Sequence, residues 1–247
     1  MNLSNVNEKY HLYSKIQKKV ITDKNFTYRI LLSILNKYIN TKKKIADLGS
    51  GVGTLDFYLA SRGNFISGFE YSESAVKTAI INANKLKLNE NIKYSRTNIA
   101  DIDKPDTFDI VLMTEVIEHM VDDVGIIKLA YKMLKMNGII IITTRSSKAP
   151  LFRAGLSELH DKNVGHLRRY TNTNLEKIVN KSGFILLEKG NTEGLLRDIL
   201  FSYPKFGGQI IRVANKCALI SDMLTIVDNL TLRLFGAAQI FIVAQKC

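Results

Sequence analysis

Short apolar runs alternate with longer stretches of helical periodicity along most of this chain. The runs occupy residues 45–48, 65–69, 92–95, 108–113, 139–143 and 184–187. Such runs are typical of buried parallel strands, which are apolar on both faces. Apolar side chains recur at helical spacing between the runs, over residues 25–40, 55–60, 74–86 and 124–136. This alternation, with its short connections, predicts a mostly parallel sheet with helices on both faces and right-handed crossovers.

The pattern changes in the second half of the chain. Residues 145–163 show no periodicity, and we expect a loop there. Thr173-x-x-Glu176 matches a capping box and predicts the start of a helix that runs to Lys181. Residues 192–237 are longer than a tight hairpin needs, and they carry an apolar stripe at helical spacing. The stripe consists of Ile210, Val213, Cys217, Ile220, Leu224, Val227 and Leu234.

This stripe predicts a helical cap, inserted at about 192–237. The cap either packs against the core and lines a substrate pocket or makes a peripheral membrane contact, which Arg212, Lys216 and Arg233 would favour. We expect one domain over residues 44–247, preceded by an N-terminal helical segment, 1–43, that forms a tail or a lid.

A glycine-dense turn follows the first apolar run and opens into a helical pattern. It reads Asp47-Leu48-Gly49-Ser50-Gly51-Val52-Gly53-Thr54. Glycines permit unusual backbone dihedrals and let a ligand approach the backbone at a helix N-terminus. A dinucleotide fingerprint would need glycine at position 54, where this chain has threonine. The turn therefore predicts a nucleotide-type cofactor other than a dinucleotide.

The Asp47-x-Gly49-x-Gly51-x-Gly53 pattern resembles the first motif of the class I S-adenosylmethionine-dependent methyltransferases. The resemblance implies a Rossmann-like, seven-stranded α/β fold, whose last strand, near residues 240–244, would be antiparallel. It also implies that Asp47 and the loop hold the amino-acid end of the cofactor. Glu70, about 20 residues beyond the loop, would bind the ribose hydroxyls. The complete predicted cofactor set is Arg29, Asp47, Gly49, Ser50, Gly51, Gly53, Glu70, Tyr71, Asn98, Ile99 and Thr114.

Three further members of this set have specific expected roles. Tyr71 would lie against the adenine, and Arg29 would meet the cofactor carboxylate. Asn98 stands where the family usually has an aspartate that binds the adenine amino group; it keeps a polar side chain but lacks the charge. Asp101, three residues further on, is an alternative for this role.

A second cluster follows the fourth apolar run. Glu115, Glu118 and His119 are spaced at i, i+3 and i+4, so we expect them on one face of a helical turn. The segment resembles Glu-x-x-Glu-His in the ubiquinone-pathway O-methyltransferases and the small-RNA 2′-O-methyltransferases. In both groups a later histidine contributes, and His166 stands in that place. The resemblance implies a site for Mg, Mn or Fe. Metal-free catalysis, with His119 as base beside Glu118, and a purely structural role stay open.

Composition narrows the class of protein only slightly. The chain has 247 residues, 46% of them hydrophobic, and its formal net charge of +12 favours contact with nucleic acid, an anionic membrane or an acidic substrate. A general richness in lysine explains the charge equally well. No apolar run approaches the roughly 18 residues of a membrane span, and the N-terminus is too polar for a signal peptide. Cys217 and Cys247 lack metal-ligand spacing. We therefore expect a cytoplasmic protein.

These patterns together predict an S-adenosylmethionine-dependent methyltransferase that acts on an oxygen of a small or lipid-like metabolite. One alternative is metal-dependent 2′-O-methylation of RNA, which the basic charge favours. The other is a non-catalytic S-adenosylmethionine-binding sensor. The pattern of residues does not decide between them, and it leaves the oligomeric state open.

Overall fold

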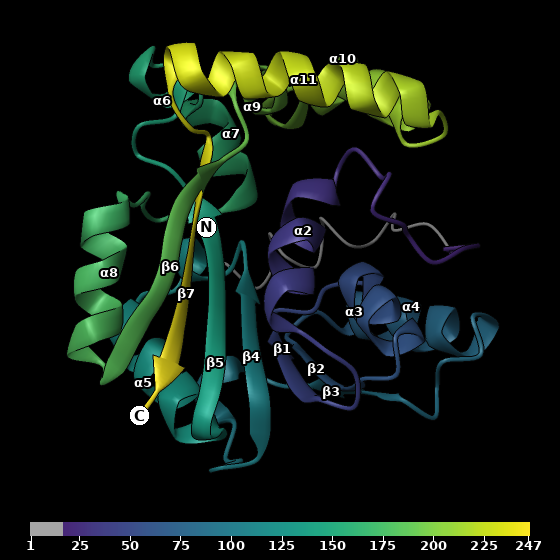
Figure 1. The fold of residues 1–247 in the computed structure, drawn as a ribbon, viewed down its shortest axis with the longest axis vertical. Coiled ribbons are helices and arrows are strands. Elements are labelled where there is room, and N and C mark those ends of the chain that lie inside the picture. The colour runs from purple at the N-terminus through teal and green to yellow at the C-terminus, as the bar shows by residue number, and fades with distance from the viewer. Residues whose placement is uncertain (1–16) are drawn as a thin grey trace.

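A single seven-stranded sheet organises the structure, a computed structural model that describes residues 17–247. The first 16 residues of the predicted N-terminal lid lie outside this range. The strand order is β3-β2-β1-β4-β5-β7-β6 (Figure 1). The strands are β1 (Lys44–Leu48), β2 (Phe65–Glu70), β3 (Ile92–Arg96), β4 (Phe108–Thr114), β5 (Leu134–Arg145), β6 (Phe184–Thr192) and β7 (Gln239–Lys246).

Helices cover both faces of the sheet and one of its ends (Figure 1). The α-helices are α2 (Arg29–Tyr38), α3 (Thr54–Ser61), α4 (Glu73–Lys85), α5 (Asp123–Met133), α6 (Pro150–Arg153), α7 (Glu158–Val164), α8 (Asn172–Lys181), α9 (Leu195–Ser202), α10 (Pro204–Ala214) and α11 (Ala218–Phe235). Two short 3-10 helices, η1 (Ile99–Asp101) and η2 (Ile117–His119), follow β3 and β4.

The core is divided by the sheet because successive strand residues point to opposite faces. Val111 and Met113 of β4 pack with α5 and α8 on one face. Ile110 and Leu112 of the same strand pack with α2 and α3 on the other. Both faces of β4 are therefore buried, which explains why its sequence is an uninterrupted apolar run.

The sheet has the direction pattern predicted from the sequence. The pairs that join β1 to β2, β2 to β3, β1 to β4 and β4 to β5 are parallel. β7 is antiparallel to both of its neighbours, β5 and β6. The mostly parallel α/β fold with an antiparallel last strand is thus confirmed.

Several local predictions were wrong. Residues 145–163 are not a plain loop, because they contain α6 and α7. The expected capping box at Thr173 does not form. Thr171 is the N-cap of α8 instead, and its hydroxyl accepts a hydrogen bond from the Asn174 backbone N–H at 3.1 Å. A threonine two residues earlier offers the same capping chemistry, so local sequence did not distinguish the two.

The segment between β6 and β7 contains α9, α10 and α11, which we call the cap. The cap crosses the end of the sheet at which the parallel strands have their carboxyl ends (Figure 1). A small apolar cluster joins the cap to the segment before α2, and its buried members are Phe26, Leu200 and Ala214. A buried ion pair at 3.3 Å joins Arg145, the last residue of β5, to Asp198 of α9. No helix among residues 17–247 is both long and apolar enough to cross a membrane.

Candidate functional site

The glycine turn connects β1 to α3 and is held against the end of β2. The backbone N–H groups of Gly49 and Ser50 donate to the Phe69 carbonyl at 2.8 and 3.2 Å. Gly49, Gly51 and Gly53 all have positive φ, at 79°, 54° and 81°. Such a left-handed backbone is costly for residues with a Cβ atom. The turn therefore exposes bare backbone immediately before the N-terminus of α3, where N–H groups lack intrahelical partners.

Close packing also requires glycine in this turn. A Cβ atom at Gly53 would lie 2.0 Å from the Tyr94 hydroxyl oxygen, and one at Gly49 would lie 2.5 Å from Cγ2 of Val116. Tyr94 belongs to β3 and Val116 follows β4. The turn is thus wedged between neighbouring segments, and its shape does not depend on the glycines alone.

Two carboxylates flank the turn, as the sequence predicted. Asp47 is buried at the end of β1, and its Oδ1 has no hydrogen-bond partner. Burial and the neighbouring carboxyl group of Asp56 raise the pKa of Asp47 well above its usual range. Glu70 ends β2, where its Oε2 accepts from the Gly51 N–H at 3.0 Å and its Oε1 from the Ser72 N–H at 2.8 Å. Both carboxylates therefore belong to the same end of the sheet as the glycine turn.

Three other predicted cofactor residues lie at the carboxyl ends of strands β2, β3 and β4. Tyr71 follows Glu70 and is 47% exposed. Asn98 uses its amide oxygen to accept from the Ala100 N–H at 3.2 Å, which caps η1 before the buried Ile99. Thr114 is the last residue of β4.

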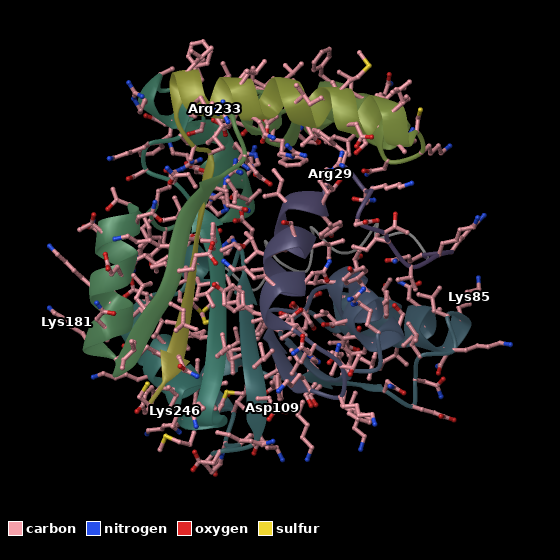
Figure 2. All side chains as sticks on the ribbon, in the orientation of Figure 1. Arg29, Lys85, Asp109, Lys181, Arg233 and Lys246 are labelled. Atoms are coloured by element: carbon pink, nitrogen blue, oxygen red, sulfur yellow. The ribbon has the colours of Figure 1, made fainter. Side chains whose placement is uncertain are left out.

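Arg29 is the one predicted cofactor residue in the described range 17–247 whose side chain contacts the cap, which it does through its guanidinium (Figure 2). Its Nη2 lies 2.7 Å from Oδ1 of Asp222, and its Nη1 donates to the Ser221 hydroxyl at 3.1 Å. Its role at the cofactor carboxylate stays a prediction. Between α2 and α11 lies a cavity of about 380 Å³, whose lining includes Arg29, Glu193 and Phe241.

Three of the four predicted metal ligands form a compact group beyond the end of β4. One ligand atom of each of Glu118, His119 and His166 lies within 4.8 Å of the other two. The two imidazole rings are 4.9 Å apart, centroid to centroid, and His166 Nε2 is 4.0 Å from Glu118 Oε1. We call these residues the Glu118 group.

The hydrogen bonds of the group leave one ligand atom free on each residue. His119 Nδ1 lies 3.1 Å from the Gly165 carbonyl oxygen, and His166 Nδ1 lies 2.8 Å from Asp161 Oδ1. With both Nδ1 atoms acting as donors, both Nε2 atoms carry lone pairs. Glu118 Oε2 accepts from the Thr144 hydroxyl at 2.7 Å, whereas its buried Oε1 has no partner. Histidine ligands of metals are usually oriented by such hydrogen bonds.

Burial governs the ionisation of the group. Burial, and then the carboxylate of Glu115, raise the pKa of Glu118 well above its usual range. Burial and the neighbouring His166 lower the pKa of His119, which favours the neutral imidazole. A bound cation would reverse the effect on Glu118, because a nearby positive charge favours the carboxylate.

Glu115 is the fourth predicted ligand, and the structure does not bring it into the group. The helical turn expected over 115–119 was wrong: η2 begins only at Ile117, and Glu115 has a positive φ of 56°. This conformation turns the side chain toward β7, where its Oε1 accepts from Gln239 Nε2 at 2.9 Å. Glu115 still influences Glu118 through its charge.

Sequence reasoning missed three polar residues at the site. Asp161 orients His166 and also accepts two hydrogen bonds from Arg169, at 2.7 and 2.9 Å. Thr144 holds Glu118. Asp56 is fully buried on α3, and burial raises its pKa to about 6. A charged residue within the apolar run Leu55–Ala60 was a usable signal for Asp56, whereas Asp161 lay in a stretch without periodicity.

The sequence matches one protein family over most of the sheet. A family model described as "Methyltransferase domain" matches residues 39–190, more than half of the chain. The chain belongs to this methyltransferase domain family. The match spans the glycine turn, both flanking carboxylates and the Glu118 group. It confirms the resemblance drawn from Asp47 and the three glycines.

Curated relatives point to one kind of family member. A ubiquinone biosynthesis O-methyltransferase from Bradyrhizobium diazoefficiens is 37% identical over 101 residues, which cover 41% of this chain and 39% of that protein. The Rickettsia typhi protein of the same name is 36% identical over 114 residues, covering 45% and 46% of the two chains. The chain thus spans less than half of the length of the curated relatives it matches.

Solved structures support the fold. A Haemonchus contortus phosphoethanolamine N-methyltransferase 2, in complex with S-adenosyl-L-methionine, matches 99% of this chain and 57% of its own, with a TM-score of 0.68 and 18% identity. A [4+2]-cyclase, SpnF, matches 88% and 80% of the two chains with a TM-score of 0.64 and 15% identity. Because a cyclase and a methyltransferase share the architecture, these likenesses concern the fold alone.

Proposed function

We propose that this protein transfers a methyl group from S-adenosylmethionine to an oxygen of a small or lipid-like metabolite. The observation that carries the proposal is the glycine turn with the buried Asp47 at its base, whose Oδ1 has no hydrogen-bond partner. A buried carboxyl with a raised pKa suits a ligand that brings positive charge. S-adenosylmethionine carries both an ammonium and a sulfonium group. Family membership and the names of the curated relatives support the same activity.

The residues around the turn would hold the cofactor in one orientation. Gly51 and Ser72 fix the Glu70 carboxylate through their N–H groups, and its remaining lone pairs can accept from two ribose hydroxyls. Asp47 would accept from the ammonium group. When bound, the cofactor supplies an electrophilic methyl carbon, and its thioether leaves without a proton. The remaining task of the chain is to aim the acceptor oxygen and to remove its proton.

The Glu118 group fits the second part of that task. Its free atoms are one carboxylate oxygen and two imidazole nitrogens, a donor set that suits Mn or Fe and, less closely, Mg. Glu118, His119 and His166 would hold such a divalent cation, which would lower the pKa of the acceptor hydroxyl. Without a cation, the neutral His119 can take that proton as a general base. A substrate with two adjacent oxygens would suit the first arrangement.

A product assay with and without a chelator tests the proposal. S-adenosylhomocysteine formation is measured over catechols, quinols, hydroxy acids and RNA ends, and calorimetry measures cofactor binding. We expect turnover of a catechol or quinol, and loss of this activity by about 100-fold or more in Glu118→Gln. The cofactor affinity of this variant should stay within about threefold of the wild type, because among residues 17–247 no hydrogen bond or ion pair joins Glu118 to the glycine turn.

Glu115→Gln is the matched control, since the sequence predicted the same role for it. We expect this variant to keep its sensitivity to chelator. An equal loss of chelator-sensitive activity in both variants would support the four-ligand site that the sequence predicted. Activity on RNA that falls steeply with salt would favour the ribose methyltransferase. Tight binding of S-adenosylmethionine without any product would favour the sensor, and binding of NAD alone would refute the cofactor itself.

A further inference from the structure

Helix α11 exposes a row of large apolar side chains and buries two polar ones. The buried residues of this helix are Ser221 and Asp228, both 0% exposed. Its large apolar residues on the opposite side are between 47% and 75% exposed. A surface helix normally buries its apolar stripe and exposes its charges. We call the exposed apolar residues the outer cap face: Leu219, Met223, Ile226, Val227, Leu230 and Leu234.

Buried polar contacts fix this orientation of α11. Asp228 Oδ2 lies 2.6 Å from Nη1 of Arg197 on α9, and both side chains are fully buried. Asp228 also accepts from the backbone N–H groups of Gly194 and Arg197, at 3.0 and 2.9 Å. Rolling the helix to hide its apolar residues would break this pair and leave the buried guanidinium of Arg197 without its carboxylate. The outer cap face therefore stays exposed in the isolated chain.

A contiguous exposed apolar surface of this kind marks a site of interaction. The charges of the cap indicate which kind of partner this surface binds. Its three acidic residues, Asp198, Asp222 and Asp228, are each paired with an arginine, namely Arg145, Arg29 and Arg197. By contrast, its exposed cations form no ion pair with any residue in the described range 17–247. These cations are Lys205, Arg212, Lys216 and Arg233, the last of which is labelled in Figure 2.

We propose that the outer cap face lies in the interface of a lipid bilayer that contains anionic lipid. The apolar side chains would enter the boundary between headgroups and acyl chains, and the unpaired cations would meet the headgroups. A second copy of the chain is a poorer occupant, because it would bring the same unpaired cations together. The net charge of +12 adds to that repulsion. Docking here would also bring the cavity between α2 and α11 close to the bilayer.

Vesicle flotation tests this proposal without measuring enzyme activity. The full chain is mixed with vesicles of phosphatidylcholine alone, or with 30 mol% phosphatidylglycerol. We expect the wild type to float with the anionic vesicles. The triple variant Met223→Gln/Ile226→Gln/Leu230→Gln should bind them at least about tenfold more weakly, because it loses apolar groups that would enter the interface. The control, Ile81→Gln/Ile185→Gln, changes residues of similar exposure on α4 and β6, and should bind like the wild type.

A pair of charge variants tests the electrostatic part. Arg212→Gln/Lys216→Gln should weaken binding to the anionic vesicles by about fivefold for each charge removed. Lys85→Gln/Lys181→Gln removes the same charge at two positions away from the cap, on opposite sides of the molecule, and should have little effect (Figure 2). Far-ultraviolet circular dichroism and thermal melting of each variant establish that it is folded before its binding is compared.

The proposal is overturned if the wild type does not float with anionic vesicles, or if the folded triple variant floats as well as the wild type. A concentration-dependent dimer that dissociates in the triple variant, without vesicle binding, would assign the outer cap face to a second copy. None of these results depends on methyl transfer, so the proposed function is tested separately.

Discussion

The glycine turn and the Glu118 group lie beyond the same end of the sheet but are built in opposite ways. The turn consists of consecutive residues and is shaped by steric contact with Tyr94 and Val116. The group joins residues from two distant segments, since His119 and the carbonyl of Gly165 are 46 positions apart. Its members are oriented by hydrogen bonds to Asp161, Thr144 and Gly165.

This difference determines which changes each region tolerates. A sterically determined turn fails when one atom is added, because close-packed surroundings cannot yield cheaply. A hydrogen-bonded group withstands small changes in volume but depends on the ionisation of its partners. The two regions should therefore respond to different substitutions and to different conditions.

The largest expected effect is in the turn. Gly53→Ala should lower the free energy of unfolding by about 3 kcal/mol and abolish cofactor binding, because its Cβ would meet the Tyr94 hydroxyl at 2.0 Å. Gly63→Ala is the matched control, since Gly63 has a similar φ of +84° but no atom within 4 Å of the added Cβ. It should cost only about 1 kcal/mol. Urea denaturation and calorimetry measure both, and equal costs would show that backbone strain alone restricts the turn.

A smaller effect is expected where hydrogen bonds support the group. Asp161→Asn removes a charged partner of His166 and Arg169, and should cost about 2 kcal/mol at neutral pH. It should also reduce turnover while leaving cofactor affinity unchanged. A parallel loss of cofactor affinity would contradict the separation of the two regions.

The stability of Asp161→Asn should also depend on pH in a different way from that of the wild type. Although burial alone opposes the charge, hydrogen bonds from His166 and Arg169 lower the pKa of Asp161. A carboxyl whose pKa is lower in the folded state adds stability above its unfolded pKa of about 3.9, and loses it as the pH falls toward the folded value. The stability difference between wild type and Asp161→Asn should therefore be constant from pH 5 to 8 and shrink below about pH 4. Urea titrations at each pH measure it.

The smallest effect is expected at the start of α8, where Thr171 lies five residues after His166. Thr171→Ala removes the side-chain cap and should cost about 1 kcal/mol. Thr173→Ala changes the residue that the sequence favoured, and should stay within about 0.5 kcal/mol. Equal melting temperatures for the two variants would show that the cap contributes nothing measurable.

The fold was largely predictable because its signals are local. Each buried strand is a continuous apolar run, and each run lies within or close to the observed strand. The turn was equally visible, since three glycines after a strand permit few alternatives. Errors arose where local preferences were weak. Residues 145–163 are too irregular to show two short helices, and Thr171 and Thr173 are equivalent as sequence signals.

The sequence by itself determined the order of strands and helices along the chain, the position of the glycine turn and the apolar stripe of the later helical segment, because each follows from the spacing of neighbouring residues. Only the tertiary structure decided which of the predicted ligands meet. It brought His166 to Glu118 and turned Glu115 toward Gln239, since contacts between distant segments depend on how the chain closes around the sheet. It also showed that the apolar side of α11 faces outward, because the buried Arg197–Asp228 pair requires the polar side to face inward.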